Sequence, residues 1–370
     1  MRGSRRPRRR PARQADHGQR RGQVRNVSRF RDEIGEQPQI ATEMLSGGRA
    51  AIDAIGARMR DASPRGFVIA ARGSSDHAAL YAKYLFGRRN RALVFLAAPS
   101  LFTHYSSPPR LDGQCVIGIS QSGSSPDVIA VIEEGARQGA LTVAITNDAD
   151  SKLAASSALV LPLGAGPERS VPASKTYTAS LLALALLSQA MQPEPDFERA
   201  LTRVPGALAE ALGHELELDR LAPSLLGPRA IVLGRGFNLA TAEEVALKLT
   251  ETSYVLARAW SVADFEHGPI AVVDEGFPVL FVGGGGPVAA DLESVARRLE
   301  AYGCRVMGMF DGKPGKIGRD AVVGIDSGLP EELTPLTLAV VGQLLAHRVA
   351  LARGIDPDRP RALNKVTRTW

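Results

Sequence analysis

The sequence predicts an α/β fold of two similar three-layer domains, in each of which helices cover a mainly parallel sheet. Short apolar runs rich in β-branched residues alternate with longer amphipathic stretches from about Phe67 onward, as in strand–helix–strand units. The strand-like runs then recur at a constant offset of 163 residues, as from Val68 to Ile231. Two copies of one domain, related by a pseudo-twofold axis, are the simplest architecture with this pattern.

The first copy shows both strands and helices. Its short apolar runs predict buried parallel strands at Phe67–Ala71, Leu93–Leu96, Cys115–Ser120 and Leu141–Ile145. Stretches with a helical pattern follow at Asp76–Gly87, Pro126–Gln138 and Ser174–Gln192. One more helical pattern, Phe30–Met44, precedes the first strand.

The second copy repeats three of these strands, at Ile231–Gly236, Pro278–Gly283 and Cys304–Gly308. The repeat divides the chain into six parts. We expect a disordered arginine-rich tail at 1–26, an N-terminal helical segment at 27–66, a first domain at 67–192, a helical linker at 193–221, a second domain at 222–355 and a C-terminal loop at 356–370.

The composition favours a globular protein of the reducing cytoplasm. Its 370 residues exceed one ordinary core, and 44% of them are hydrophobic and 23% charged. No apolar run approaches the ~18 residues of a membrane span, and the longest candidate is Ala179–Leu187. Two cysteines, Cys115 and Cys304, allow neither a disulfide framework nor a cysteine zinc cluster.

The net charge of +6 comes from the tail. Residues 1–26 hold ten arginines and one acid, Asp16, so the rest of the chain carries a charge of −3. A mildly acidic body argues against a nucleic-acid-binding fold, although a basic arm or a start site assigned too early could explain the tail. The chain has seven lysines against 38 arginines, so each lysine is a candidate for ammonium chemistry.

A serine-rich loop follows the third predicted strand. In Ser120–Pro126 (Ser-Gln-Ser-Gly-Ser-Ser-Pro), four hydroxyls and a glycine lead into a helix that Ser125 caps. Hydroxyls and free N–H groups at a helix start predict a site for a phosphate monoester. Turn formation is the alternative, and it is favoured for Gly73–Ser75 taken alone. The equivalent loop of the second copy, Gly283–Gly286, has no hydroxyl, so we expect one phosphate site per chain.

Three other segments are candidates for acid–base chemistry. Glu244, Lys248 and Glu251 are spaced four and three residues apart and share one helix face, for which a solvated ion-pair face is the alternative. His267 precedes Gly-Pro and so lies in a tight turn, where a histidine is often only a structural hydrogen-bonding group. Lys365 follows Asn364 near the C-terminus, where a basic tail is the alternative.

Together these motifs resemble the sugar isomerase (SIS) domain family, in the double form of the isomerase half of glucosamine-6-phosphate synthase and of stand-alone deaminases. The resemblance covers roughly residues 30–370. Its motifs are Gly-Ser-Ser, Ser-Gln-Ser-Gly-Ser-Ser, Ser-Val-Pro-Ala-Ser-Lys, Glu-Val-Ala-Leu-Lys-Leu-Thr-Glu, His-Gly-Pro and the terminal Asn-Lys. It implies two SIS domains, proton transfer between aldose and ketose sugar phosphates, and neither metal nor cofactor.

The resemblance also implies roles for individual residues. Glu251 matches the carboxylate that moves a proton between C1 and C2, and Lys365 matches a lysine that closes on the sugar and can form an imine. His267 matches a ring-opening residue that the neighbouring subunit lends, which implies a homodimer. Lys248 matches a lysine of the same helix as Glu251, with a less defined role. The implied phosphate and sugar ligands are Ser75, Ser120, Gln121, Ser122, Ser125 and the backbone of Val171 and Ala173.

The sequence departs from the family pattern in three ways. Ser124 and Ser125 stand where the family often has Thr or Glu, and Asp264–Glu266 replaces a more basic stretch. No glutaminase domain precedes residue 30, so glutamine is not expected to supply ammonia. We therefore expect an enzyme that converts glucosamine 6-phosphate and water to fructose 6-phosphate and ammonia. The alternatives are isomerisation or deglycation of another sugar phosphate, or a non-catalytic sugar-phosphate sensor.

Overall fold

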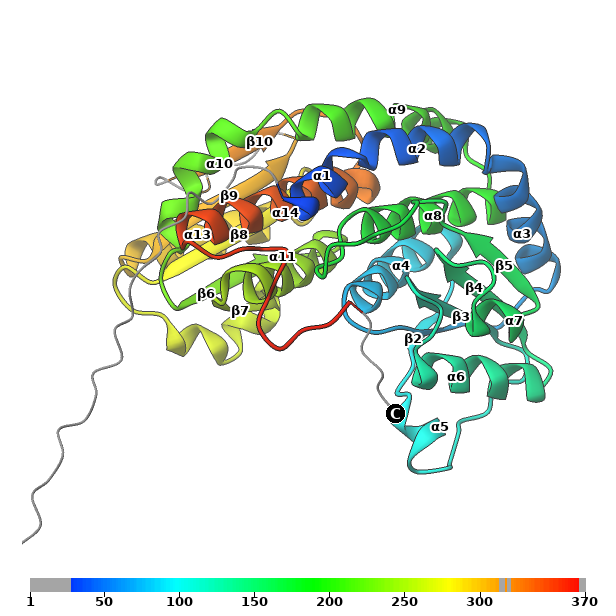
Figure 1. The fold of residues 1–370 in the computed structure, drawn as a ribbon. Helices are drawn as coiled ribbons and strands as arrows, with labels where there is room; N and C mark the ends of the chain where they lie inside the picture. The colour runs from blue at the N-terminus through cyan, green and yellow to red at the C-terminus, as the bar shows by residue number, and fades with distance from the viewer. Residues whose placement is uncertain (1–27, 313–316, 318–320, 366–370) are drawn as a thin grey trace, which may run out of the picture.

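The computed structural model describes residues 28–312, Ile317 and residues 321–365, and it contains two five-stranded sheets (Figure 1). The first sheet has the order β2-β1-β3-β4-β5, with β1 Phe67–Ala70, β2 Val94–Leu96, β3 Cys115–Ser120, β4 Leu141–Thr146 and β5 Leu159–Pro162. The second has the order β10-β9-β8-β6-β7, with β6 Arg229–Gly234, β7 Leu256–Ser261, β8 Pro278–Gly284, β9 Arg305–Asp311 and β10 Ala321–Ile325. All neighbouring strands are parallel, so the predicted fold class is confirmed.

The two sheets repeat one topology. Val68 of β1 lies opposite Val116 of β3, and Ile231 of β6 lies opposite Val279 of β8. Both residues of the second pair follow those of the first by the same 163 positions. The strand pairing therefore reproduces the offset read from the sequence, as expected for a duplicated domain.

The largest core is common to both domains. It combines the inner faces of the two sheets with α4 Ser74–Asn90, α8 Lys175–Met191, α11 Asn238–Ser253 and α14 Thr334–Ala352. Two smaller cores cover the outer faces, under α6 Pro126–Arg137 on the first sheet and under α13 Ala289–Ala301 on the second. Close packing of the shared core fixes how the two domains face one another, and with it any site at their junction.

The other helices are shorter or lie outside the shared layer. They are α1 Arg29–Gly35, α2 Gln37–Ser46, α3 Arg49–Asp61, α5 Ser100–Thr103, α7 Lys152–Ala155, α9 Pro195–Ala211, α10 Glu215–Leu221 and α12 Val262–Glu266, with 3₁₀ turns η1 Ala222–Leu225, η2 Pro269–Val272 and η3 Glu331–Leu333. The single helical pattern predicted for Phe30–Met44 is divided at Glu36. Pro38 lies in the first turn of α2 and has no N–H with which to continue α1.

One stretch of the described residues has the length and apolar composition of a membrane span. It covers Glu331–Ala352, and 83% of its most apolar window is buried inside the protein, as in the core helix of a globular protein. The prediction that Ala179–Leu187 is the longest apolar candidate is therefore wrong. Gln343 and His347 interrupt the longer stretch and hid it from a search for uninterrupted apolar residues.

Candidate active site

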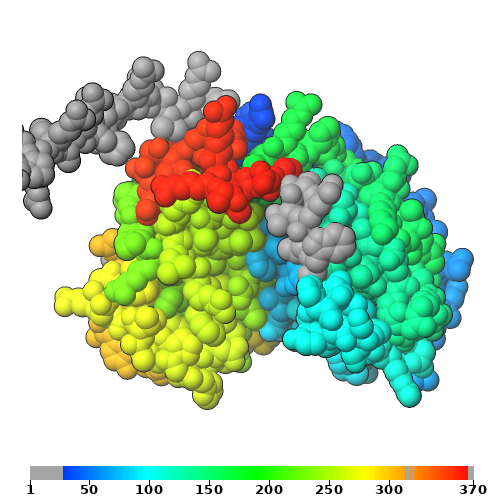
Figure 2. Space-filling view, turned by 60° about the horizontal axis from the view of Figure 1, so that its bottom comes forward, coloured from blue at the N-terminus to red at the C-terminus, as the bar shows by residue number. Residues whose placement is uncertain are grey.

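A cavity of about 340 Å³ lies where the two domains meet, next to the carboxyl ends of β1 and β3. In the space-filling view, the red C-terminal segment crosses the junction between the yellow-green second domain and the green first domain (Figure 2). The cavity is lined by Arg72–Ser75, Ile119–Ser122, Ser125, Glu168, Val171, Ala173, Thr176, Tyr177, Lys248, Glu251 and Leu363–Lys365. Every residue to which the resemblance assigns a role belongs to this lining except His267, whereas the further candidates Glu244 and Ser124 lie outside it.

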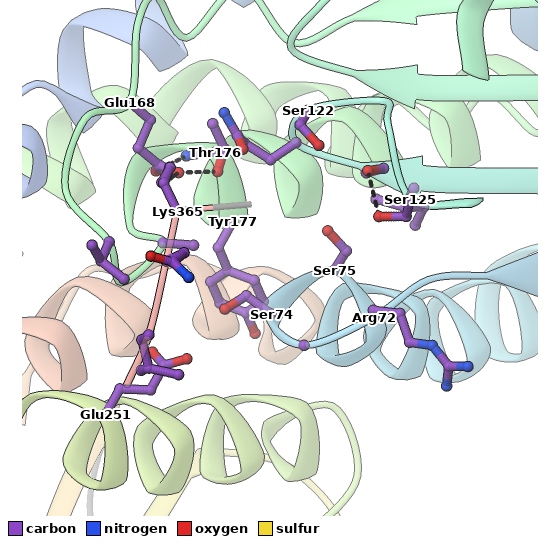
Figure 3. A pocket seen from close by; sticks show the side chains of 18 of the residues that line it. Arg72, Ser74, Ser75, Ser122, Ser125, Glu168, Thr176, Tyr177, Glu251 and Lys365 are labelled. Carbon is purple, nitrogen blue, oxygen red and sulfur yellow. Dashed lines mark hydrogen bonds and ion pairs between the residues drawn. The ribbon is translucent and has the colours of Figure 1, made fainter. Parts of the chain in front are cut away.

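The serine-rich loop forms one end of the cavity (Figure 3). Ser122 Oγ and Ser124 Oγ are 2.8 Å apart, and Ser120 Oγ lies 3.5 Å from Ser125 Oγ. Gly123 adopts a φ of +58°, and a Cβ there would come within 2.0 Å of Ser151 Oγ, so the loop requires glycine at this position. Hydroxyls therefore line this end of the cavity just before the start of α6, an arrangement suited to a phosphate group.

The start of α4 adds a second set of hydroxyls beside that loop. Gly73 has a φ of +56°, and a Cβ at this position would meet no atom within 4 Å, which is consistent with an open cavity above it. Ser74 and Ser75 follow it at the start of the helix and line the cavity. Arg72 also lines the cavity, and its Nε donates to Asp127 Oδ2 at 2.6 Å. This end of the cavity therefore combines hydroxyls, a helix N-terminus and one guanidinium group.

The opposite wall carries the ionisable residues of α11, which was predicted as a helix around Ala242–Glu251. Lys248 Nζ lies 2.5 Å from Glu251 Oε2 and 3.5 Å from Glu244 Oε1. The side chains of Glu244 and Lys248 are each 1% exposed, whereas that of Glu251 is 22% exposed. A solvated ion-pair face, the alternative given above, does not fit these two buried side chains.

Burial and charge pairing act in opposite directions on this group. Burial alone would raise the pKa of Glu244, but Lys248, His77 and Ser74 together hold it below its usual value. Burial alone would lower the pKa of Lys248, but Glu244 and Glu251 hold it above its usual value. Both residues are therefore charged near neutral pH, and the ammonium group of Lys248 lies directly beside Glu251 at the cavity wall.

The third wall joins the loop before α8 to the C-terminal segment. Lys365 Nζ donates to Glu168 Oε2 at 2.7 Å. Glu168 Oε1 accepts from the backbone N–H groups of Ser174 and Thr176 at 2.9 and 3.1 Å. The same loop brings Val171 and Ala173 to the cavity. The side-chain amine of Lys365 and the buried carboxylate of Glu168 thus meet at the edge of the cavity that also holds Glu251.

Four lining residues with polar side chains were not predicted from the sequence, namely Arg72, Glu168, Thr176 and Tyr177. Glu168 carried a usable signal, because an acid shortly before a long predicted helix can accept hydrogen bonds from the helix's first N–H groups. Tyr177 carried no signal, since it lies within an apolar helix and its ring is almost fully buried. Among the described residues, no three His, Cys, Asp or Glu side chains are grouped to hold a metal ion.

His267 lies elsewhere in this chain. It follows the last residue of α12 and precedes Gly268, whose φ is +135°, so the tight turn predicted from His-Gly-Pro is present. The side chain is exposed and does not line the cavity of its own chain. The structure therefore does not place His267 at the cavity of its own chain.

A comparison with models of known protein families agrees with the two repeated sheets. A family model described as the SIS domain matches residues 62–190 and 227–353, one match over each sheet. The chain belongs to the SIS domain family. Its two SIS domains are the two halves of the duplication, and the resemblance seen in the motifs is confirmed.

Relatives of known name share this double-SIS region. Over 343 residues, the chain is 33% identical to a glutamine–fructose-6-phosphate aminotransferase (isomerizing) from Thermococcus kodakarensis, covering 90% of this chain and 56% of that protein. The chain thus spans about half the length of the curated relatives it matches.

Solved structures show the same fold. A proposed phosphosugar isomerase from Silicibacter pomeroyi DSS-3 has a TM-score of 0.82 and 35% identity, covering 90% of this chain and 100% of that chain. A glucosamine-6-phosphate deaminase from Thermotoga maritima has a TM-score of 0.74 and 21% identity, covering 92% and 100%, which is a likeness of fold.

Proposed function

We propose that this SIS protein is an amino-sugar-phosphate isomerase that converts glucosamine 6-phosphate and water to fructose 6-phosphate and ammonia. The observation that carries the proposal is that one cavity is lined by the serine-rich loop, by Glu251 and by Lys365. These parts supply, in order, a receptor for the 6-phosphate, a carboxylate for proton transfer and an amine for the carbonyl end of the sugar.

The proposed reaction balances in two stages. In the open-chain aldehyde, Glu251 removes the proton from C2 and returns it to C1, while O1 gains one proton and the amine nitrogen loses one, so the double bond moves from C1–O to the C2–N bond. Water then adds at C2 of this imine and ammonia leaves, giving the ketone. The ammonium group of Lys248 lies 2.5 Å from the Glu251 carboxylate that must accept the first proton.

Lys365 has one of two roles in this scheme. Its ammonium form neutralises the negative charge that develops on the sugar oxygens. Its neutral form can instead attack a ketone at C2 and release water, giving an imine. Arginine could fill the first role but not the second.

The two cysteines of the sequence are buried and have no role in the proposed reaction. Cys115 is fully buried in β3, and burial raises the pKa of its thiol to about 12. Cys304 is 7% exposed, and burial raises its pKa as well. Neither thiol of this sequence is an accessible nucleophile for the amide of glutamine.

The test is direct. Purified protein is incubated with glucosamine 6-phosphate, and both ammonia and fructose 6-phosphate are measured. Galactosamine 6-phosphate, glucose 6-phosphate and a fructosamine phosphate form the comparison panel. Turnover of another member of the panel, without ammonia from glucosamine 6-phosphate, would reject the deaminase assignment and keep the isomerase class.

The variant Glu251→Gln separates an enzyme from a sensor. It should bind the sugar phosphate with nearly unchanged affinity and lose turnover by about 10²–10⁴-fold, the range for one acid–base group. Binding without turnover in the unaltered protein, for every sugar phosphate of the panel, would favour the sensor.

We further propose a homodimer in which His267 serves the cavity of the neighbouring chain. The exposure of His267 and its absence from the lining of its own cavity support this arrangement. Co-expression of Glu251→Gln with His267→Asn then yields mixed dimers with one intact site each, and about a quarter of the normal activity should return under random pairing. No recovery, with mixed dimers demonstrated by mass, would place the function of His267 within its own chain or outside catalysis.

A further inference from the structure

A chain of buried and half-buried polar side chains connects the first domain to Glu251. Ser74 Oγ and His77 Nδ1, both on α4, lie 2.9 and 2.8 Å from the two carboxylate oxygens of Glu244 on α11. From Glu244 the path continues through Lys248, whose Nζ lies 2.5 Å from Glu251. It therefore begins on the helix that carries the sugar-binding Ser75 and ends at the candidate proton carrier.

The direction of each hydrogen bond follows from charge. Glu244 is ionised, because its pKa lies below the usual value despite burial, so its oxygens only accept. His77 must then carry a proton on Nδ1, and Ser74 must donate its hydroxyl proton. Two hydrogen-bond donors and the Lys248 ammonium group, 3.5 Å away, surround one carboxylate that is 1% exposed, which offsets the large cost of burying it.

Other charged groups face the His77 imidazole from the elements around it. Burial raises the pKa of Asp76 on α4 and of Glu243 on α11, and His77 partly offsets both increases. Arg258 on β7 acts on Glu243 in the same direction. His77 is thus set among carboxylates of both domains, and its side chain is 17% exposed and outside the lining of the cavity.

We infer that His77 is a positioning residue for Glu251, acting through Glu244 and Lys248. The inference rests on the proposed function, because it takes Glu251 as the proton carrier. With His77 in place, Glu244 has a full set of donors, and Lys248 gives its shortest hydrogen bond to Glu251. Without His77, the buried Glu244 draws Lys248 toward itself. Glu251 then loses part of its neighbouring positive charge and holds its proton more tightly.

The experiment compares two substitutions of one side chain. His77→Asn keeps an N–H group near the position of Nδ1, whereas His77→Leu removes the donor. His77→Leu should lower kcat about tenfold, leave KM within about twofold and move the acidic limb of the kcat profile to higher pH. His77→Asn should restore most of kcat and the original limb. His104→Leu, at an exposed histidine of the same domain, is the matched control.

A second variant should move the acidic limb of the kcat profile in the opposite direction. Glu244→Gln removes the competing carboxylate, so Lys248 pairs with Glu251 alone, and the acidic limb should move to lower pH. A purely structural role for these residues predicts no opposed shifts. Equal kcat and equal limbs for His77→Leu and the unaltered protein would overturn the inference, as would equal impairment of His77→Leu and His77→Asn.

A measurement without substrate separates this inference from the proposed function. Carboxyl ¹³C NMR titration of Glu251 in the ligand-free protein should show a raised pKa in His77→Leu and a lowered one in Glu244→Gln. These shifts are expected even if glucosamine 6-phosphate is not the substrate. Their absence in folded variants would reject the path from His77 to Glu251 itself.

Discussion

Lys365 and Glu168 form an ion pair across 197 residues of sequence, with Nζ and Oε2 2.7 Å apart. The Glu168 side chain is fully buried and that of Lys365 is 24% exposed. Since Glu168 also accepts from the first N–H groups of α8, its position is fixed by the helix. This ion pair therefore holds the side-chain amine of Lys365 at the cavity when no sugar is bound.

The chemistry of Lys365 can be tested by replacing it with arginine. Lys365→Arg retains the positive charge and can still pair with Glu168, but it cannot form an imine with a ketose. Borohydride reduction in the presence of fructose 6-phosphate should link the sugar covalently to Lys365 in the unaltered protein and leave the variant unlabelled. Lys152→Arg, at an exposed lysine, should label as the unaltered protein does. Unchanged labelling of Lys365→Arg would show that the imine forms at another lysine.

The serine-rich loop should bind the phosphate without holding the fold together. Ser122→Ala and Ser125→Ala each remove a hydrogen bond to a charged acceptor, worth about 1.5–3 kcal/mol, so the Kd for the 6-phosphate should rise about tenfold to hundredfold. Calorimetry measures Kd, and thermal unfolding without ligand should change little. Ser46→Ala, at an exposed position of α2, is the control. A fall in stability with unchanged Kd would make the loop structural.

The central strands could be predicted from the sequence, because strands covered on both faces read as continuous apolar runs. The run Cys115–Ser120 is buried at every position and was predicted with the bounds of β3. The edge strand β7 was missed, since Arg258 interrupts its apolar residues and much of the strand is exposed. A strand with one free edge and an exposed face lacks the pattern that marks a central one.

The site could be predicted where local sequence determines local structure. Ser120–Ser125 and Glu251 lie on motifs whose strand, turn or helix can be read from neighbouring residues. The pairings of Lys365 with Glu168 and of His77 with Glu244 join positions 197 and 167 residues apart. Such contacts depend on how the two domains pack, and local sequence patterns do not show that packing.

Helix α1 should hold two segments of the cavity together. Glu33, which is 5% exposed, accepts from the backbone N–H groups of Arg169 and Ser170 at 2.5 and 3.2 Å, in the loop that carries Val171. Asp358 of the C-terminal segment accepts from the N–H groups of Arg29 and Phe30 at 2.8 and 2.9 Å.

Replacing Glu33 by leucine leaves these two loop amides without an acceptor. Each buried amide without an acceptor costs about 1–3 kcal/mol. Glu33→Leu should therefore lower the free energy of unfolding, speed hydrogen exchange in the loop at 168–174 and weaken sugar-phosphate binding. Glu33→Gln, which keeps one acceptor, should lie between. Asp32→Asn, at an exposed acid of the same helix, should change none of these quantities. Unchanged exchange in Glu33→Leu would show that α1 does not hold the loop.

His347 should make the fold sensitive to acid. It is 1% exposed on α14, and neither ring nitrogen has a hydrogen-bond partner among the described residues. Burial, followed by the charges of Arg348 and Arg31, lowers the pKa of His347 to about 4. Since the unfolded chain has the ordinary value near 6.5, the unfolded state binds more protons between these two values. The free energy of unfolding should therefore fall as the pH drops from 6.5 toward 4, by at most about 1.4 kcal/mol per pH unit from this group.

Substitution by leucine removes this term. His347→Leu should match or exceed the unaltered protein in stability at pH 7.5, because an apolar side chain replaces two ring nitrogens without partners. Its stability should also fall less between pH 6.5 and 4.5, measured by urea unfolding at several pH values. Carboxylates away from His347 titrate equally in both proteins and cancel in the difference, whereas the charge of His347 lowers the pKa of Glu215, so that carboxyl adds a small contribution of its own. If the free energy of unfolding fell equally with pH in both proteins, His347 would be protonated or paired in the folded state. The buried end of α14 would then tolerate the charge.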